Sequence, residues 1–497
     1  MDDGFAFEPA VVQGEAVRSG RVTSRELVEL HLDRIARYNG GLNAVVTLEA
    51  DGARRRADEL DAELRNGRVR GPFHGVPMTV KDAFATAGIR TTSGSEERRD
   101  HVPSEDAVAV ARLVAAGAVV LGKTNVPEGI TGQETANALF GRTCNPWDPE
   151  RTPGGSSGGA AAAVATGLSA LELGSDSGGS IRQPAHCCGI YGHVPTQGLV
   201  PLRGHLPLVS LDEERLQIDL MGAGPLARHP DDLAAALGIL SGPDGADADG
   251  WRLQLPPARC SDVAGLRVAL WSHDPDVPVE SAVRTCLEDT GDRLEAAGGI
   301  VDRKARPDFR LADAERVAFA LWVASTTIST DGFADLVTTA DALDPGDDRL
   351  TARRLRAEAM RHHDWVALDL ERRRLARAWM RLLADHDVVI CPVSPVVAVR
   401  HDPEPERVAD VERRIARTID VDGVARPYLD QMSWNIVVGM CGLPSTVAPV
   451  GMTAAGLPVG AQIVGRPFAD HTTIAAARLL GRLTGGYRPP PGFTVPP

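Results

Sequence analysis

The chain has 497 residues, 43% of them hydrophobic and 24% charged, a composition typical of a globular protein. Its formal net charge of −14 argues against a nucleic-acid partner, because binding to a phosphate backbone requires clustered positive charge. No apolar run approaches the roughly 20 residues that span a bilayer, and the acidic start at Met1 lacks the apolar core of a secretory signal, so we expect a cytoplasmic protein with no membrane partner.

The cysteines give no sign of a cross-linked or metal-bound framework. There are seven of them, an odd number, and no two have C-x-x-C spacing. The sequence therefore predicts neither a disulfide scaffold nor a zinc site, and we expect reduced cysteines.

Two helices are predicted near the N-terminus, on the outside of the core. A capping box formed by Thr23 and Glu26 begins the first helix. The second is highly charged, runs over about residues 52–65 and ends at Asn66 and Gly67, a pair that favours the left-handed conformation.

A β/α alternation follows. Residues 75–83 predict a loop leading into a strand with Lys81 near its end, residues 107–116 predict a helix, and residues 118–121 predict a strand. This order implies a sheet covered by helices. Residues 117–124 also match P-loop spacing, but an apolar strand occupies the place of the phosphate-cradling turn, so we do not expect nucleotide binding.

Lysine is rare in this chain. Of 53 Lys plus Arg residues only Lys81, Lys123 and Lys304 are lysines, yet one of them lies inside the predicted strand at residues 75–83. Arginine cannot be deprotonated in a protein whereas lysine can, so a proton-transfer role would require lysine at position 81. For Lys123 we expect a structural, hydrogen-bonded role.

Residues 151–198 contain two glycine-flanked serines, Ser156 and Ser180, separated by an alanine-rich helix pattern at 159–166 and a short apolar strand pattern at 171–173. Residues 177–180 have little side-chain bulk, so their backbone N–H groups can converge on one point. Several preorganised donors beside an attacking atom are what an oxyanion requires.

Rival interpretations of this region are weaker. Residues 154–158 fit the G-x-S-x-G nucleophile elbow, but a loop composition precedes Ser156 where an elbow needs a strand. His186 and His193 are expected to be packed polar residues. Cys187 and Cys188 suggest a Cys-Lys-Glu amidase of the nitrilase type as an alternative, but that alternative leaves both Gly-Gly-Ser motifs unexplained. We therefore expect the two cysteines to be buried and to pack as small hydrophobic residues.

The remaining chain continues the α/β pattern. A helix is predicted at 230–240, a Gly/Asp-rich breaker at 241–250, a strand at 267–271, a helix at 281–297 and a short strand near Ile300. Residues 311–386 have a helical, Arg-rich pattern with no motif assignable to chemistry, and we expect packed helices with solvated arginines. Strands are predicted at 388–391, 444–450 and 457–464, and no repeat or linker demands a second domain.

The motif Gly-Ser-Asp-Ser-Gly-Gly-Ser-Ile-Arg around Ser180, preceded 24 residues earlier by the Gly-Gly-Ser-Ser-Gly-Gly motif around Ser156, resembles the amidase signature family of Ser-cisSer-Lys hydrolases. The resemblance extends, in one order, to residues 74–82, 122–125, 145–147, 224–228 and 442–445. It implies a single α/β/α domain over 1–497, with a mixed central β-sheet covered by helices on both faces. Within it we expect N-terminal helices (1–70), a signature core (71–240), a helical cover that shapes the pocket (about 250–430) and a C-terminal return to the sheet (431–497).

The resemblance also implies roles for the three central residues. Ser180 would be the nucleophile that forms an acyl-enzyme. Ser156, preceded by a cis Gly155–Ser156 peptide bond, would pass the proton from Ser180 to Lys81. Lys81 would be the base, with burial lowering its pKa. No metal or organic cofactor is required. The oxyanion hole would use the backbone of Ser177, Gly178, Gly179 and Ser180, while scaffold roles fall to Gly155, Asp176 and Arg182.

Substrate identity is less constrained. The family includes hydrolases of linear amides, carbamates (urethanases), aryl anilides (aryl acylamidases) and cyclic amides, and the glutaminase A-type subunit of the tRNA-dependent amidotransferase. We expect a stand-alone amidase acting on a small-molecule amide, with the glutaminase function as the alternative, a catalytically silent scaffold as a third interpretation, and a homodimer left open. For the pocket wall the sequence suggests Ile130, Thr131, Leu206 and Trp434, for each of which core packing is an equal alternative.

Overall fold

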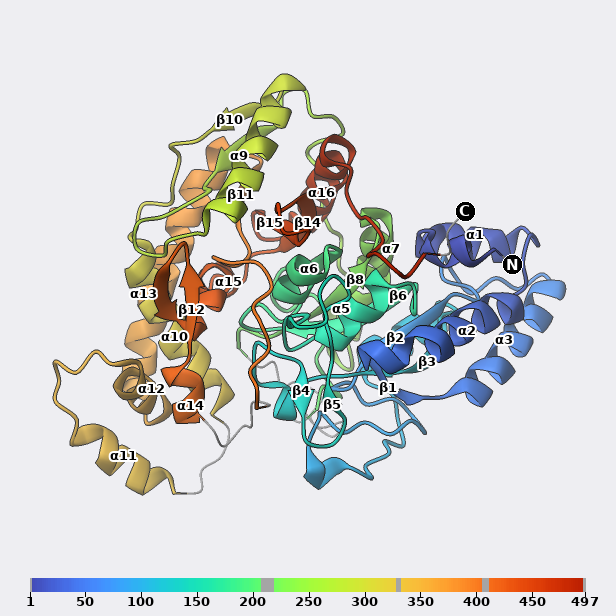
Figure 1. Cartoon of the computed structure of the whole chain (residues 1–497), viewed down its shortest axis with the longest axis horizontal. Coiled ribbons are helices and arrows are strands. Elements are labelled where there is room, and N and C mark those ends of the chain that lie inside the picture. Colours follow the sequence, from blue (N-terminus) through green and yellow to red (C-terminus); the bar gives the residue numbers. More distant parts are fainter. Residues whose placement is uncertain (1, 207–218, 328–331, 405–410, 495–497) are drawn as a thin grey trace.

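The computed structural model describes residues 2–206, 219–327, 332–404 and 411–494. Within them, a central sheet has 11 strands in the order β1-β3-β2-β6-β8-β7-β14-β15-β11-β9-β10 (Figure 1). Their bounds are β1 Val45–Leu48, β2 Pro77–Lys81, β3 Val119–Thr124, β6 Leu171–Asp176, β7 Tyr191–Val194, β8 Gly222–Ala227, β9 Arg267–Leu270, β10 Ile300–Asp302, β11 Val388–Pro392, β14 Ser445–Met452 and β15 Pro458–Val464. Two small hairpins pair β4 Ala136–Asn137 with β5 Gly141–Arg142, and β12 Thr418–Val421 with β13 Val424–Pro427.

The sheet is mixed. Strand β2 pairs in parallel with both β3 and β6. From β6 through β8, β7, β14 and β15 to β11, each strand is antiparallel to the next, and β11 then pairs in parallel with β9. Because parallel strands end at the same edge, the C-terminal residues of β2 and β6, Lys81 and Asp176, lie at one edge of the sheet.

Helices surround the sheet. Their bounds are α1 Ala10–Arg18, α2 Ser24–Leu42, α3 Ala50–Arg65, α4 Val108–Ala115, α5 Gly158–Ala165, α6 Arg182–Cys188, α7 Pro230–Leu240, α8 Asp247–Gly250, α9 Ser281–Ala296, α10 Leu311–Thr326, α11 Phe333–Asp341, α12 Leu350–Glu358, α13 His362–Asp385, α14 Val411–Ala416, α15 Ser433–Gly439 and α16 Asp470–Thr484. Figure 1 shows α1–α3 at one end of the molecule and α10–α14 at the other. None of the helices in the described ranges is long and apolar enough to cross a membrane.

Two neighbouring residues of β14 show that both faces of the sheet are covered. The Thr446 hydroxyl donates a hydrogen bond to Thr473 of α16, whereas Val447 packs in an apolar cluster with Ala160 of α5 and Ala185 of α6. Successive side chains of a strand point to opposite faces, so α16 covers one face and the α5–α6 pair covers the other. The predicted mixed sheet with helices on both faces is confirmed.

Local sequence signals correctly predicted helices and strands in the N-terminal half of the chain. The Thr23–Glu26 capping box is formed, with both of its hydrogen bonds, and α2 begins directly after Thr23. The region with P-loop spacing contains strand β3, as its apolar run indicated. Further on, the predicted helices at 230–240 and 281–297 correspond to α7 and α9.

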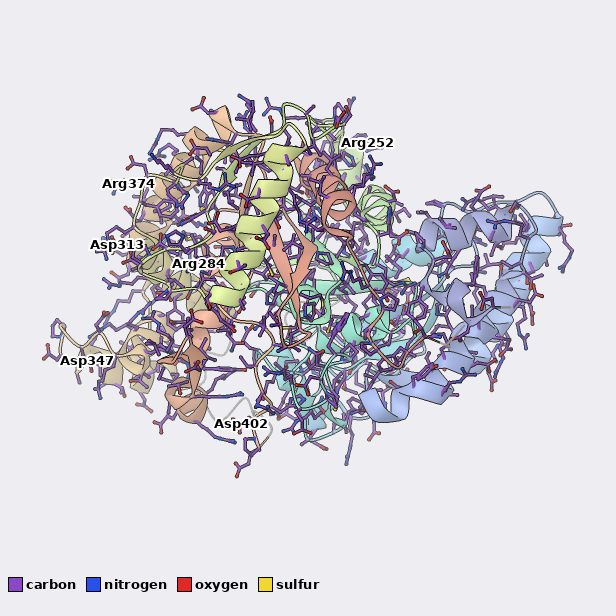
Figure 2. All side chains as sticks on the ribbon, turned by 45° about the horizontal axis from the view of Figure 1, so that its top comes forward. Arg252, Arg284, Asp313, Asp347, Arg374 and Asp402 are labelled. Carbon is purple, nitrogen blue, oxygen red and sulfur yellow. The ribbon has the colours of Figure 1, made fainter. Side chains whose placement is uncertain are left out.

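The Arg-rich region from α10 to α13 packs through its apolar positions and exposes many of its charges, although Arg372 and Asp369 form a largely buried pair. Trp379 of α13 lies 6.1 Å, between ring centroids, from Trp271 at the end of β9. Figure 2 shows Arg374 of α13 and Asp313 of α10 pointing outward, and both are exposed. The prediction of packed helices is therefore confirmed, and that of solvated arginines holds for Arg374 but not for Arg372, whose side chain is 15% exposed.

Candidate active site

Lys81 ends the fully buried strand β2, and its side chain has no solvent exposure. Its Nζ donates hydrogen bonds to Ser156 Oγ at 2.7 Å, to Ser175 Oγ at 3.0 Å and to the Ser175 carbonyl at 3.2 Å. Burial lowers the pKa of Lys81 to about 7, against the opposing influence of Asp176 and Glu172. Near neutral pH this lysine is therefore able to accept a proton.

Ser156 lies in the loop before α5, and the Gly155–Ser156 peptide bond is cis, as the resemblance implied. Gly155 is packed so closely that a Cβ at this position would lie 2.5 Å from the carbonyl oxygen of Gly132. Only glycine fits there without displacing the backbone of the neighbouring loop. This packing holds the Ser156 loop against residues 132–133, which contribute to the pocket described below.

Ser180 lies in the loop that joins β6 to α6. The Ser157 amide donates to the Ser180 carbonyl at 3.1 Å and so ties this loop to the Ser156 loop. A Cβ at residue 178 would lie 2.6 Å from Met432, and a Cβ at residue 179 would lie 2.6 Å from Asn435, so both glycines allow the loop to pass close to α15 and the turn before it. The two serine loops are therefore fixed side by side.

The carboxylate of Asp176 organises the Ser180 loop. It accepts hydrogen bonds from the amides of Gly179 (2.8 Å) and Ile181 (2.9 Å), and from the Arg182 guanidinium (2.7 and 3.1 Å). Burial opposes its ionisation, but Arg182 and the amides outweigh burial and hold the Asp176 pKa below its usual value. The geometry fits the scaffold role expected of Asp176 and Arg182.

The same contacts narrow the set of oxyanion donors. The Gly179 amide, expected in the oxyanion hole, is bonded to Asp176. Within the described residues, the amides of Ser177, Gly178 and Ser180 form no hydrogen bond, so these three amides are free to bind an oxyanion.

A pocket opens at Ser180. Its described lining includes Ser177, Gly178 and Ser180, together with an apolar wall that contains Met221, Trp322, Leu429 and Met432. Trp322 Nε1 donates a 2.8 Å hydrogen bond to Ser177 Oγ, which links α10 to the loop. The helical cover therefore supplies part of this pocket.

Two of the four suggested wall residues line this pocket. Ile130 and Thr131 do so, and Ile130 has a left-handed backbone (φ 58°) that β-branched residues rarely adopt. Leu206 and Trp434 are not among its described lining residues. Leu206 packs against the main core, and the Trp434 ring lies edge-on to Trp271 at 4.9 Å, so the core-packing alternative describes both.

Sequence reasoning missed two polar residues at the Lys81 end of the site. Ser175 Oγ lies 3.0 Å from Lys81 Nζ and 2.8 Å from His205 Nε2. His205 is fully buried, and burial, with the nearby Lys81, lowers its pKa to about 3, so the imidazole is neutral at neutral pH. Ser175 lies inside the Gly-Ser-Asp motif, and this position could have indicated a role in the site. No feature of the local sequence separates His205 from the other histidines.

The two histidines proposed as structural lie in structural settings. His193 lies between Thr446 (2.9 Å) and Asp470 (3.3 Å), and the Gly460 amide donates to His186 Nδ1 at 2.9 Å. These contacts hold both imidazoles within the packing of the sheet.

Lys123 and the two neighbouring cysteines are likewise accounted for by packing. Lys123 Nζ donates to the Phe84 carbonyl and to Thr86 Oγ1 (2.7 Å), which fits the structural role expected of this lysine. Burial raises the pKa of Cys187 to about 12, so its thiol is protonated, and the Cys188 thiol lies 3.6 Å from the Pro153 carbonyl. Protonated buried thiols are poor nucleophiles.

The site thus contains a buried lysine that can be neutral, a serine in contact with it, a second serine at a pocket and three free amides in the loop of that second serine. These are the parts needed for nucleophilic acyl transfer. Among the described residues, no group of three or more His, Cys, Asp or Glu side chains could hold a metal ion.

Comparison with known proteins agrees with this chemistry. The Amidase family model matches residues 26–474. The A subunit of glutamyl-tRNA(Gln) amidotransferase from Thermosynechococcus vestitus is 33% identical to this chain, and the alignment covers 96% of this chain and 98% of that protein. Indoleacetamide hydrolase of Bradyrhizobium diazoefficiens is also 33% identical, and the alignment covers 95% of this chain and 86% of that protein. The crystal structure of a bacterial aryl acylamidase of the amidase signature family has a TM-score of 0.78 and 25% identity, covering 96% of both chains. The chain therefore belongs to the amidase signature family.

Proposed function

We propose that this protein is an amidase that hydrolyses the C–N bond of a small carboxylic amide, through an acyl-enzyme on Ser180. The observation that carries the proposal is the 2.7 Å contact between the buried Lys81 Nζ and Ser156 Oγ, beside the loop that presents Ser180 to the pocket. A lysine with a pKa of about 7 in this contact can draw a proton from Ser156.

In the acylation step, Ser180 Oγ attacks the amide carbonyl while its proton passes to Ser156 and the Ser156 proton passes to neutral Lys81. The free amides of Ser177, Gly178 and Ser180 stabilise the oxyanion of the tetrahedral intermediate. Collapse breaks the C–N bond, and the proton on Lys81 returns through Ser156 to the leaving amine. Water then attacks the acyl-enzyme by the same proton path, releasing the carboxylic acid and restoring Ser180.

The relatives support this proposal and keep one alternative open. Indoleacetamide hydrolase and aryl acylamidase are amide-hydrolysing enzymes by name, while the amidotransferase relative supports the glutaminase alternative. The proposed amidase function also extends to anilides, carbamates and esters, whose carbonyls accept the same attack.

Chemical labelling tests the site directly. A fluorophosphonate should modify the purified protein once, and peptide mass analysis should place the adduct on Ser180, with Ser180→Ala unlabelled. An adduct on Ser156 or Cys187, or a protein that never reacts, would contradict the assignment.

Turnover tests the function. The purified chain should hydrolyse at least one member of a panel of amides, anilides, carbamates and esters without ATP, tRNA or a partner protein. Turnover of glutamine only, and only with a partner protein, would establish the glutaminase alternative instead.

A further inference from the structure

One charged residue faces the pocket at Ser180. Among the described lining residues Arg414, from helix α14, is the single one with an ionisable side chain, and the lining contains no aspartate or glutamate. The rest of the described wall is backbone, the polar side chains of Gln133 and of several serines and threonines, and the apolar side chains of Ile130, Met221, Trp322, Leu429 and Met432. A cation therefore lies in a largely apolar pocket beside the nucleophile.

The neighbouring arginines are occupied by carboxylates of the protein. Arg413 pairs with Asp402 and with Glu404 (2.9 Å), and Arg417 donates to the buried Glu134 at 3.1 Å. Arg414 lies between them, and within the described part of the chain its guanidinium has no carboxylate or hydrogen-bond partner. These pairs hold α14 on both sides of Arg414, and no carboxylate of the described residues pairs with its guanidinium.

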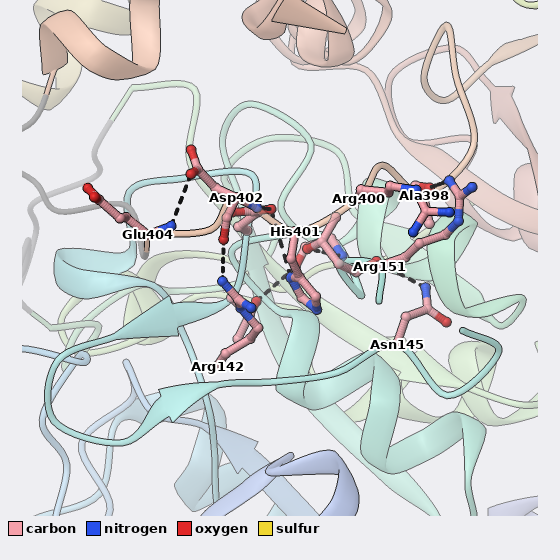
Figure 3. Close-up of polar contacts among 12 residues, drawn as sticks. Arg142, Asn145, Arg151, Ala398, Arg400, His401, Asp402 and Glu404 are labelled. Atoms are coloured by element: carbon pink, nitrogen blue, oxygen red, sulfur yellow. Dashed lines mark hydrogen bonds and ion pairs between the residues drawn. The ribbon is translucent and has the colours of Figure 1, made fainter. Parts of the chain in front are cut away.

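The segment that leads to α14 is anchored to the signature region. Figure 3 shows Arg151 reaching the carbonyl of Ala398 (2.6 Å) and Arg142 reaching the carbonyl of Asp402. The Asp402 amide donates to Glu134 at 2.9 Å, and Glu134 follows the pocket residue Gln133 in the chain. The partners that hold α14 are thus fixed to the loop that forms the pocket wall.

A second polar group in the pocket also lacks a partner. Gln133 is 6% exposed, and within the described residues its side-chain amide oxygen has no hydrogen bond. A buried polar atom without a partner is costly, so the pocket wall carries an unsatisfied acceptor beside Arg414 in the described structure.

We propose that Arg414 binds a carboxylate carried by the substrate, so that the enzyme prefers amides bearing an anionic group at the end of an apolar chain or ring. The inference rests on the proposed amidase function. A guanidinium binds a carboxylate through two parallel hydrogen bonds, and the surrounding apolar wall accommodates the carbon skeleton between carboxylate and amide. Glutamine fits less well, because its ammonium group would find no acidic side chain in the described lining.

Matched substrate pairs test this proposal. The two members of each pair have the same carbon skeleton and end in a carboxylate or in a methyl group: glutaryl against pentanoyl 4-nitroanilide, the monoanilide of octanedioic acid against octanoyl anilide, and 4-acetamidobenzoate against 4-methylacetanilide. The value of kcat/KM for each substrate is measured with the wild-type protein and with the variants Arg414→Gln, Arg414→Lys and Arg374→Gln. Arg374 is an exposed arginine of α13, so its variant changes the net charge equally and leaves the pocket intact.

We expect at least one anionic member to be favoured over its neutral partner by about 10- to 100-fold, the usual value of a charge-assisted hydrogen bond. Arg414→Gln should lower kcat/KM far more for the anionic member of a pair than for the neutral member and so remove this preference. Arg414→Lys should retain part of the preference, and Arg374→Gln should retain all of it. A preference that survives Arg414→Gln, or the lack of any anionic preference in the wild type, would overturn the inference.

Calorimetric titration of the same pairs into Ser180→Ala provides a measurement that needs no turnover. Tighter binding of an anionic amide that disappears in the Ser180→Ala, Arg414→Gln double variant supports the inference, and equal binding of all pairs contradicts it. The proposed function fails separately, when no amide of either charge is hydrolysed and Ser180 does not react with a fluorophosphonate.

Discussion

The ionisation of Lys81 gives the sharpest prediction about the mechanism. Burial lowers its pKa to about 7, and only the neutral amine accepts a proton, so activity is low at acid pH and rises as pH increases through 7. With this pKa, about one molecule in ten holds neutral Lys81 at pH 6 and about nine in ten at pH 8. The value of kcat/KM at pH 6 should therefore be about tenfold below its plateau.

The assay is kcat/KM for an anilide substrate between pH 5.5 and 9.5. Because free histidine titrates near 6.5, the position of the acid limb does not by itself identify the base, and variants must do so. Lys81→Arg should abolish activity, since arginine does not release its proton. The acid limb of the pH profile should stay at the same pH in three control variants that fold normally, His186→Asn, His193→Asn and Lys123→Met. Activity that survives Lys81→Arg, together with a limb that moves with either histidine, would refute the lysine-base mechanism.

Two further substitutions test the surroundings of the site. Ser175→Ala removes the hydroxyl that contacts Lys81 Nζ at 3.0 Å, and we expect a decrease in kcat/KM of about tenfold with a displaced acid limb, whereas a purely structural Ser175 would lower stability and leave the limb unmoved. Arg182→Met leaves the Asp176 carboxylate buried without its cation, and chemical denaturation should show a loss of about 3–5 kcal/mol; unchanged stability would mean that the backbone amides alone support Asp176.

Sequence alone predicted the elements whose signals are local. The capping box at Thr23, the apolar run of β3 and the helix α7 depend on residues within a few positions of each other, and the structure contains all three. Lys81 was singled out because lysine is rare in this chain, and the structure places it against Ser156. Composition thus located a residue whose partner lies 75 positions away.

Elements whose residues contradict local propensity were not predicted. Strand β8 has the sequence Gly-Ala-Gly-Pro-Leu-Ala, which local rules assign to a loop, but it lies between β6 and β7 and pairs with both. A Cβ at Gly224 would lie 2.1 Å from the carbonyl oxygen of His193, so glycine serves close backbone packing inside the sheet. Helix α6 has seven residues, includes Pro184 and packs against β14 and β15, so tertiary contacts determine it.

The pocket could not be predicted from the sequence for a related reason. An apolar residue near a motif is equally suited to a core or to a ligand wall, and only the folded chain decides between them. Trp434 packs edge-on against Trp271, whereas Trp322, which local patterns did not distinguish, reaches Ser177. Arg414 lies far from Ser180 in the sequence, within a charged segment, and its place in the pocket is defined only once the chain has folded.

The lowered pKa of Lys81 likewise depends on its surroundings in the folded chain and could not be predicted from the motif alone. Glu172 of β6, the strand that pairs with β2, is fully buried, and burial raises its pKa to about 8, so it is largely protonated near neutral pH. A charged carboxylate there would favour the protonated lysine; the neutral acid, which is bonded to the hydroxyls of Thr79 and Thr124, does so far less. Asp176 keeps its charge, but that charge is directed at Arg182 and the loop amides. Lys81 can therefore be neutral beside two acids, because one is protonated by burial and the other is neutralised by its own cation.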